Sequence, residues 1–258
     1  MTTLETATQA KSRTTQITLE TRGGAAWLTL DGPSTRNALD TTSAAAIVAA
    51  CDEIDANDAI GVAVISGGQG AFCSGAARST LAGLSEVPAH VAYEELGCLY
   101  RAFDRVGRLM LPTIARIDGA AVGAGLNLAL AADLRVATER SQFISGFAGV
   151  GIHPGGGHFH LIDRAAGRQT AAAMGLFAQP LDAAAAAAAG LIWAALPVDE
   201  IDDVVAGMCA TLAADPALAR AMKSTLNLTT ASQDSWAVAV EVERARQMWS
   251  LTRNPRSK

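Results

Sequence analysis

Short apolar runs separated by turns dominate the first half of this chain. The runs Ile17–Thr21 and Ala26–Leu30 flank Arg22-Gly23-Gly24, a combination that predicts a β-hairpin. The continuous apolar run at 61–66 is typical of a strand buried on both faces. Further strands are predicted at Thr113–Ile117, Leu134–Ala137 and Gln142–Ser145.

Helical spacing of apolar residues occupies the segments between these strands. In residues 41–54 the apolar side chains recur every three or four positions, and a second helix is predicted at 93–106. Residues 119–125 are expected to form a small-residue loop that opens into a helix ending near Ala132. Strands that alternate with helices in this way favour right-handed crossovers and a parallel sheet.

The later part of the chain is predicted to be mostly helical. Asp182 precedes seven alanines at 183–189 and then Gly190, which is the pattern of an N-cap, a strong helix former and a C-terminal glycine. No linker and no internal repeat interrupts the sequence. We therefore expect a loose tail at 1–14, an α/β core at 15–195 and a helical region at 196–258.

Composition narrows the class of protein. The chain has 258 residues, 50% of them hydrophobic and 17% charged, which excludes intrinsic disorder. A formal charge of −5 and 5% aromatic residues argue against a nucleic-acid-binding surface. The cysteines are scattered, the first 16 residues lack an apolar core, and no strongly apolar run reaches the roughly 18 residues of a membrane span. We expect a cytoplasmic protein with no nucleic-acid or membrane partner.

The standard catalytic motifs are absent from the sequence. There is no phosphate-binding loop, no dinucleotide-binding glycine fingerprint, no zinc-protease motif and no nucleophile elbow. Two small-residue segments remain, at 70–77 and 118–127, and each follows a predicted parallel strand. Ligands bind at this end of such sheets, and two backbone N–H groups that converge there form an oxyanion hole. Tight packing of the loops is the alternative interpretation.

Five blocks of sequence carry a family resemblance. They are LTLDGPSTRNAL (28–39), AVISGGQGAFCSGAA (63–77), LPTIARIDGAAVGAGLNLALAADLRVA (111–137), GVGIHPGGGHFHLIDRAAGRQTA (149–171) and AGLIWAALP (189–197). In their order and spacing the chain resembles the crotonase superfamily, which is the enoyl-CoA hydratase/isomerase family, over residues 15–250. The resemblance implies an α/β fold, a crotonase-like spiral of ββα units whose C-terminal helices pack in trimers, often paired as hexamers.

The same resemblance implies a ligand and its contacts. An acyl-CoA thioester would place its carbonyl oxygen between the backbone N–H groups of Ala76 and Ala124. No separate cofactor is expected, because coenzyme A enters as part of the substrate. The residues expected to contact CoA are Arg36, Ala38, Ser74, Gly75 and Arg78. For the two arginines, a solvated surface position is the alternative interpretation.

The departures from the family pattern concern acid–base chemistry. Hydratases of the family use two glutamates, and on this chain those positions fall on Asn127 and Phe147. Neither an amide nor a phenyl ring exchanges a proton at neutral pH. In many members the last helix also lends a basic residue to a neighbouring subunit's CoA. That helix is expected to be shortened or absent here, since the chain ends soon after Leu251.

Other side chains are candidates for the missing roles. Tyr100 could orient the substrate, with ordinary helix packing as the alternative. His153 is a candidate general base, because a neutral imidazole suits that role near pH 7, with loop stabilisation as the alternative. His158 and His160 flank the same glycine run, but no acidic partner is visible beside the three histidines, so no metal site is predicted.

Three hypotheses for the function follow. The first is a lyase or isomerase that stabilises an enolate at Ala76 and Ala124. The second is an acyl-CoA-binding protein without turnover, since both acid–base positions lack a titratable group. The third, a peptidase on a related spiral fold, requires a serine activated by histidine, and nothing near Ser74 supplies one. A homotrimer or hexamer is expected from the apolar residues of the C-terminal helices.

Overall fold

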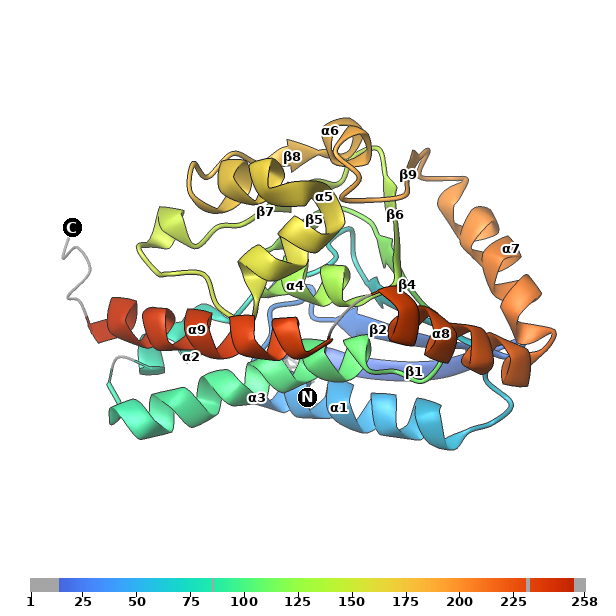
Figure 1. Ribbon diagram of the computed structural model, residues 1–258, viewed down its shortest axis with the longest axis horizontal. Coiled ribbons are helices and arrows are strands. Elements are labelled where there is room, and N and C mark those ends of the chain that lie inside the picture. Colours follow the sequence, from blue (N-terminus) through green and yellow to red (C-terminus); the bar gives the residue numbers. More distant parts are fainter. Residues whose placement is uncertain (1–13, 85, 231–232, 253–258) are drawn as a thin grey trace, which may run out of the picture.

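The core of the molecule is a six-stranded sheet with the order β1-β2-β3-β4-β6-β9 (Figure 1). The computed structural model describes residues 14–84, 86–230 and 233–252, so residues 1–13 of the predicted tail lie outside the described residues. The predicted hairpin pairs β1 with β2 antiparallel, and the remaining neighbours in this sheet are parallel. The strands are β1 (Gln16–Arg22), β2 (Ala25–Asp31), β3 (Val62–Gly67), β4 (Thr113–Ile117), β6 (Leu134–Thr138) and β9 (Ala194–Leu196).

A second, three-stranded sheet stands beside the first and contains β5 (Ala120–Val122), β7 (Gln142–Ile144) and β8 (Leu181–Asp182). The expectation that residues 119–125 form only a loop was therefore wrong. Residues 120–122 become a strand because they pair in parallel with β7, and a bridge from Cys73 to Ala121 continues the pairing on the other side. The segments after β3 and β4 thus lie against each other, as a ββα spiral requires.

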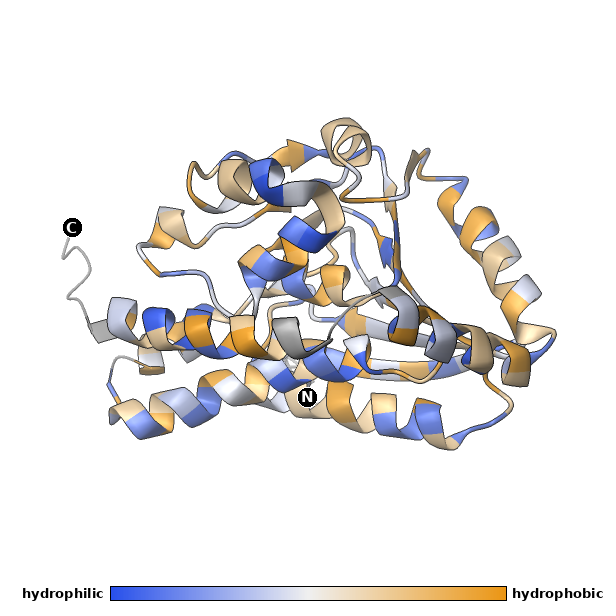
Figure 2. Cartoon of the chain, in the orientation of Figure 1, coloured by the Kyte–Doolittle hydropathy of each residue, from blue (hydrophilic) through white to orange (hydrophobic). Residues whose placement is uncertain are grey.

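Helices cover both faces of the large sheet. They are α1 (Thr41–Ala56), α2 (Arg78–Leu84), α3 (Ala89–Gly107), α4 (Ala124–Ala131), α5 (His158–Gly175), α6 (Ala183–Ala188), α7 (Ile201–Ala213), α8 (Pro216–Thr230) and α9 (Gln233–Thr252), with a short 3₁₀ helix at Ala148–Val150. Polar and apolar residues alternate along α3, as in a helix with one buried side (Figure 2).

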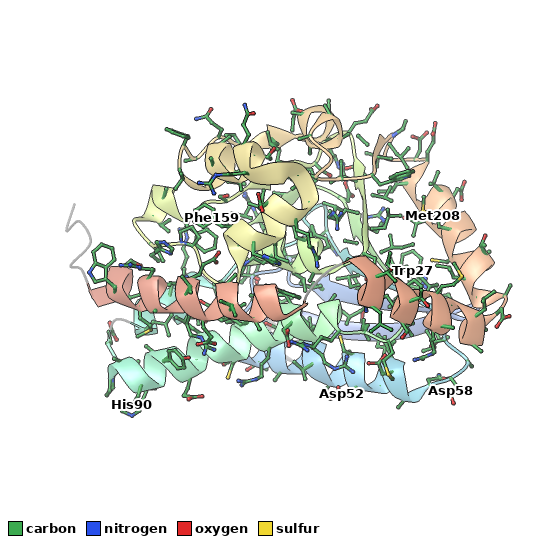
Figure 3. The ribbon with its side chains drawn as sticks, in the orientation of Figure 1. Trp27, Asp52, Asp58, His90, Phe159 and Met208 are labelled. Carbon is green, nitrogen blue, oxygen red and sulfur yellow. The ribbon has the colours of Figure 1, made fainter. Side chains whose placement is uncertain are left out.

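The continuous apolar run of β3 is explained by this layering. Ala63 and Ile65 pack in the main core with residues of α1 and α3, whereas Val62 and Val64 pack against α7 on the opposite face. Figure 3 shows Met208 of α7 close to Trp27 of β2, and both pack against this second cluster. A strand covered on both faces must be apolar at every position, which confirms the prediction for residues 61–66.

Local capping signals are also confirmed. Asp182 accepts a hydrogen bond from the Ala185 amide at 2.8 Å and begins the alanine helix α6. The helix stops before Gly190, which adopts a left-handed φ of 78°. Among the described residues, no single helix has the length and apolarity to cross a membrane, and only α7 and α8 together, bent by 98°, pass such a test on length and composition.

The last helix that the structure describes is α9, which runs for 20 residues and lies along α3 and near the start of α5 (Figure 1). The expectation that the helix lending a basic residue to a neighbouring subunit is shortened or absent stays a prediction. Helix α9 is held along α3 by buried apolar and polar side chains, among them Trp236 and Gln247, which local sequence rules do not identify as contacts. Helix α9 therefore forms part of the wall around the site described next.

Candidate active site

Two small-residue loops converge at the C-terminal ends of β3 and β4. The Val122 amide donates to the Cys73 carbonyl at 2.9 Å, which ties the second loop to the first. Gly125 has no room for a side chain, because a β-carbon there would overlap the Cys73 carbonyl oxygen. Gly75, with a φ of 92°, lies so close that an added β-carbon would be 3.5 Å from the Ala124 nitrogen. Small residues are therefore required for this approach.

The amide pair, meaning the N–H groups of Ala76 and Ala124, is left free by this arrangement. Leu39 donates to the Gly75 carbonyl at 2.8 Å and accepts from the Ala77 amide at 2.7 Å, so the intervening Ala76 N–H points away from Leu39. Ala124 is the first residue of α4, where an amide has no partner inside the helix. Within the described part of the chain, neither N–H group has an acceptor.

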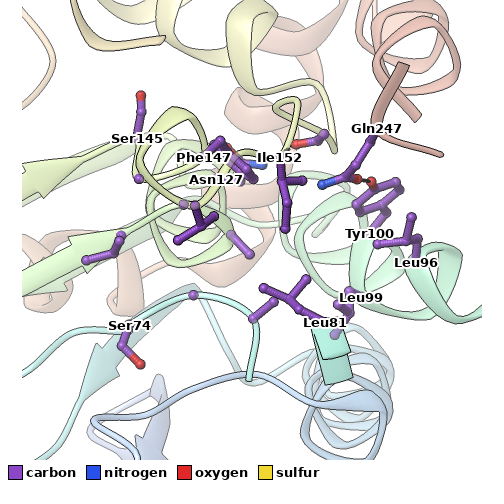
Figure 4. Close-up of a pocket in the computed structure, with 18 of the residues that line it drawn as sticks. Ser74, Leu81, Leu96, Leu99, Tyr100, Asn127, Ser145, Phe147, Ile152 and Gln247 are labelled. Atoms are coloured by element: carbon purple, nitrogen blue, oxygen red, sulfur yellow. Dashed lines mark hydrogen bonds between the residues drawn. The ribbon is translucent and has the colours of Figure 1, made fainter. Parts of the chain in front are cut away.

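The amide pair opens into an apolar cavity of about 250 Å³, drawn in Figure 4. One wall comes from α2 and α3, and the opposite wall comes from the loop after β7. The apolar lining side chains include Leu81, Leu96, Leu99, Phe103, Val122, Phe147, Val150 and Ile152. Such a mostly apolar cavity fits the hydrocarbon part of a ligand, because burial of CH₂ groups is favourable.

A larger polar hollow of about 640 Å³ adjoins the cavity, and Ser74, Ala76 and Arg78 line both. Arg36 and Ala38 also line the hollow, and their contact with CoA stays a prediction. Both arginines are exposed, and their guanidinium groups have no hydrogen-bonded or ionic partner among the described residues. Two unpaired guanidinium groups suit the phosphates of a nucleotide-like ligand.

Asn37 positions the loop that carries Arg36, a role the sequence analysis missed. It is fully buried in a left-handed conformation with a φ of 59°, which asparagine tolerates better than most residues. Its amide accepts from the Gly32 N–H at 2.7 Å and donates to the Ala71 carbonyl at 2.7 Å. The loops on both sides of the hollow are thereby joined through one side chain.

Asn127 is held in one orientation by a buried hydrogen-bond chain. Its Nδ2 lies 2.9 Å from the Gly155 carbonyl, which can only accept, so Nδ2 must be the donor. Its Oδ1 therefore accepts from Nδ1 of His158 at 2.7 Å. This leaves Nε2 of His158 unprotonated, and it accepts from the Ser145 hydroxyl at 2.6 Å. Burial lowers the pKa of His158 to about 3, which keeps the imidazole neutral.

Ser145, His158 and Asn127 have the order of groups found in nucleophilic triads, but the geometry does not support that role. The Ser145 side chain is directed away from the middle of the cavity (Figure 4), and the residue is only 4% exposed. The hydroxyl of Ser74, in the first loop, donates instead to the Thr35 carbonyl at 2.8 Å. Neither serine is placed to attack a carbonyl held by the amide pair.

Phe147 fills the space beside the amide pair. A β-carbon added at Gly123 would lie 3.6 Å from its ring atom Cζ, and its ring packs edge-on against His158 with centroids 4.9 Å apart. The side chain therefore separates the buried imidazole from the second glycine loop. It offers no proton donor or acceptor to a ligand.

Tyr100 faces the cavity from α3, and its hydroxyl donates to Oε1 of Gln247 on α9. Burial raises the pKa of Tyr100, so the phenol keeps its proton at neutral pH. Sequence reasoning missed Gln247, because no local motif marks a glutamine in the last helix. Only the packing of α9 across α3 brings the two side chains together.

Helix α9 also holds the loop before α5. Glu243 accepts from the amides of His158 at 2.7 Å and Phe159 at 3.0 Å, which satisfies the free N-terminal groups of α5. Ser250 accepts from the His153 amide at 3.0 Å, and the indole of Trp236 donates to the Gly156 carbonyl at 3.3 Å. Burial raises the pKa of Glu243 to about 7.

The histidines have different positions. His153 is not among the residues that line the cavity. Its Nδ1 lies 2.7 Å from the Pro154 carbonyl oxygen, and because a carbonyl only accepts, Nδ1 is the donor. His160 lines a separate surface hollow together with Asp163 and Arg168. Across the described residues, no group of three or more histidine, cysteine, aspartate or glutamate side chains could hold a metal ion.

Comparisons with known proteins identify the family of this chain. The model of the enoyl-CoA hydratase/isomerase family matches residues 20–253. A protein of Mycobacterium tuberculosis named "Probable enoyl-CoA hydratase" is 42% identical over 195 residues, which cover 75% of this chain and 72% of the relative. Another of that name from Rhodobacter capsulatus is 35% identical over 203 residues, 79% of this chain and 77% of the relative.

Solved structures show the same likeness. An enoyl-CoA hydratase from Mycobacterium avium subsp. paratuberculosis superposes with a TM-score of 0.79 at 29% identity, covering 93% of this chain and 94% of that one. An enoyl-CoA hydratase from Bacillus halodurans has a TM-score of 0.84 at 22% identity, covering 92% and 95%, and supports the fold alone. The crotonase-like α/β spiral with C-terminal helices is thus confirmed. With its family model matched over nearly the whole of the described chain, this protein belongs to the enoyl-CoA hydratase/isomerase family.

Proposed function

We propose that this chain is an acyl-CoA thioester enzyme, a lyase or isomerase, that binds the thioester carbonyl at the amide pair and stabilises an enolate there. The observation that carries the proposal is the amide pair itself. Two free backbone donors, from Ala76 and Ala124, meet where an apolar cavity joins a hollow with unpaired arginines. The acyl group would occupy the cavity, and the CoA phosphates would lie near Arg36 and Arg78. Coenzyme A enters with the substrate, and no further cofactor is part of the proposal.

The amide pair favours chemistry in which the thioester oxygen becomes negative. Loss of a proton, or addition at the carbon chain, places charge on that oxygen as an enolate. Preorganised N–H groups stabilise such charge, and removal of one donor typically costs ~10²–10³-fold in rate. The N-terminus of α4 at Ala124 adds a favourable dipole.

The site lacks the carboxylates expected for hydration of an enoyl group. Asn127 has its amide oriented by Gly155 and His158, and Phe147 has no titratable group. Each missing acid or base is typically worth ~10²–10⁴-fold. Hydration of crotonyl-CoA is therefore expected to be very slow compared with the ~1–10³ per second of typical enzymes.

This absence favours one alternative, an acyl-CoA-binding protein without turnover. A titration with a CoA thioester and an assay of several enoyl- and acyl-CoAs for turnover distinguish the two. If the protein binds CoA thioesters and turns over at least one of them, the enzyme is supported. If it binds them but turns over none, the alternative is supported. Absence of binding would contradict both. Asn127→Glu combined with Phe147→Glu should raise crotonyl-CoA hydration if the remaining scaffold is competent.

The proposal includes a homotrimer or hexamer. Leu218, Met222 and Leu226 follow one another at intervals of four along α8, and each is about half exposed. Val242 and Trp249 of α9 are also exposed. Apolar side chains grouped in this way suit an interface between copies of a chain. A monomer in light scattering at micromolar concentration would contradict the assembly.

A further inference from the structure

Three polar side chains from three helices surround Gly155 at one wall of the mostly apolar cavity. Asn127 of α4 donates to the Gly155 carbonyl at 2.9 Å. Tyr100 of α3 and Gln247 of α9 approach so closely that a β-carbon at Gly155 would overlap both. We call Asn127, Tyr100 and Gln247 the Gly155 wall, and all three line the cavity.

Gln247 has an unused donor. The Tyr100 hydroxyl donates to its Oε1, which leaves both hydrogens of Nε2 without an acceptor among the described residues. The residue as a whole is only 3% exposed, but Nε2 is not among the fully buried atoms that lack a partner, so this nitrogen reaches the surface of the cavity. Figure 4 shows the amide nitrogen on the side of Ile152, while the oxygen faces Tyr100. An amide donor that faces the cavity and has no protein acceptor is available to a ligand that carries an acceptor atom.

Asn127 has a second unused donor of the same kind. One hydrogen of Nδ2 is engaged by Gly155, and Oδ1 is engaged by His158, so the remaining N–H is free for a ligand. His158 and Ser145 act as positioning residues, because their hydrogen bonds prevent the amide from turning over. The Gly155 wall therefore carries neutral amide donors, and that of Asn127 is fixed in direction by its partners.

The geometry points to a subsite in which Gln247 and Asn127 bind a neutral acceptor oxygen on the acyl group, beyond the thioester carbonyl. A hydroxyl or keto oxygen fits, because amide N–H groups donate to both. A carboxylate is disfavoured there, because the three side chains of the Gly155 wall are neutral and the cationic residue that lines the cavity, Arg78, also lines the adjoining polar hollow. Gln247 is thus a specificity-determining residue supplied by the last helix.

This inference rests on the proposed function, and its test compares three probes by calorimetric titration. The probes are butyryl-CoA, 3-hydroxybutyryl-CoA and 4-hydroxybutyryl-CoA, which share the chain length and differ in the hydroxyl. At least one hydroxylated probe should bind about tenfold more tightly than butyryl-CoA, as expected for one additional hydrogen bond in the cavity. Equal or weaker binding of both hydroxylated probes overturns the subsite. If none of the three probes binds, the proposed function fails as well.

Variants then assign the preference to its residues. Gln247→Met keeps the length of the side chain and removes the N–H donors. It should reduce affinity for the preferred hydroxylated probe about tenfold, with a much smaller effect on butyryl-CoA. Tyr93→Phe is the matched control, because Tyr93 lies on the same helix as Tyr100 but bonds Glu241 outside the cavity. A uniform loss for all probes in Gln247→Met would contradict the assignment, and circular dichroism checks that each variant is folded.

Discussion

The amide pair and the Gly155 wall face the same cavity but are built in different ways. The amide pair consists of backbone N–H groups, and the side chains around it are only required to be small. The Gly155 wall consists of side chains whose chemistry depends on each residue and on the partners that orient it. A main-chain donor survives an exchange of glycine for alanine, whereas an exchange of glutamate for asparagine changes the reaction. Under the proposed function, the part of the site that binds the thioester would keep the family pattern, and the part that supplies acid–base groups would depart from it.

Removal of one amide should have the largest effect. Ala124→Pro deletes a donor but keeps the helix, because proline is well tolerated at the first helical position. Turnover of any accepted thioester should fall by ~10²–10³-fold. Ala124→Gly keeps the N–H group, so its turnover should be at least tenfold higher than that of Ala124→Pro. Similar losses in the two variants would show that the backbone donor does not carry the effect.

The next effect concerns the attachment of α9 to the site. Burial raises the pKa of Glu243 to about 7, so the folded protein disfavours loss of this proton. Between pH 4.5 and 7 the unfolded chain releases the proton more readily, and stability falls as the pH rises. Glu243→Gln removes this dependence. Its stability relative to the parent should increase from pH 5 to pH 8 by on the order of 3 kcal/mol, measured by denaturant unfolding. A constant difference would contradict a raised pKa.

A conservative change in the Gly155 wall tests the orientation of Asn127. In Asn127→Asp one carboxylate oxygen would face the Gly155 carbonyl, which lies 2.9 Å from Nδ2 in the parent. The proton must then be retained, so the pKa of the new carboxyl should rise above its usual range. The variant should be destabilised by about 1–3 kcal/mol at pH 7 and less below pH 4, where both states are protonated. A destabilisation that does not depend on pH would contradict the orientation in which Nδ2 of Asn127 faces the Gly155 carbonyl.

The smallest effect is expected at the end of the hydrogen-bond chain. Ser145→Ala leaves Nε2 of His158 buried without a donor and should cost about 1–2 kcal/mol of stability. Ser66→Ala is a suitable comparison, because Ser66 pairs with the Thr29 hydroxyl at 2.9 Å in a partly buried position. If the two variants lose the same stability, the hydrogen-bond chain from Ser145 through His158 to Asn127 stabilises the fold no more than an ordinary pair of hydroxyl groups. Affinity for the hydroxylated CoA probe should fall only in Ser145→Ala.

The sequence alone determined the elements with strong local signals. The apolar run at 61–66, the helix beginning at residue 41 and the cap at Asp182 follow from side-chain periodicity and local hydrogen bonds, and the structure confirms each of them. The spiral fold was predicted from the resemblance of the five blocks and is confirmed by the family match. The small-residue segments marked where loops approach closely, because only glycine and alanine permit that contact.

Tertiary structure decided what the loops and the last helix do. Residues 120–122 form a strand only because β7 lies beside them, and α9 contributes Gln247 only because it packs across α3. The direction of the Asn127 amide follows from Gly155 and His158, which are distant in sequence. Such contacts depend on pairs of residues that local periodicity does not connect. The physical reason is that a buried polar group takes whichever partner the fold brings within hydrogen-bond distance.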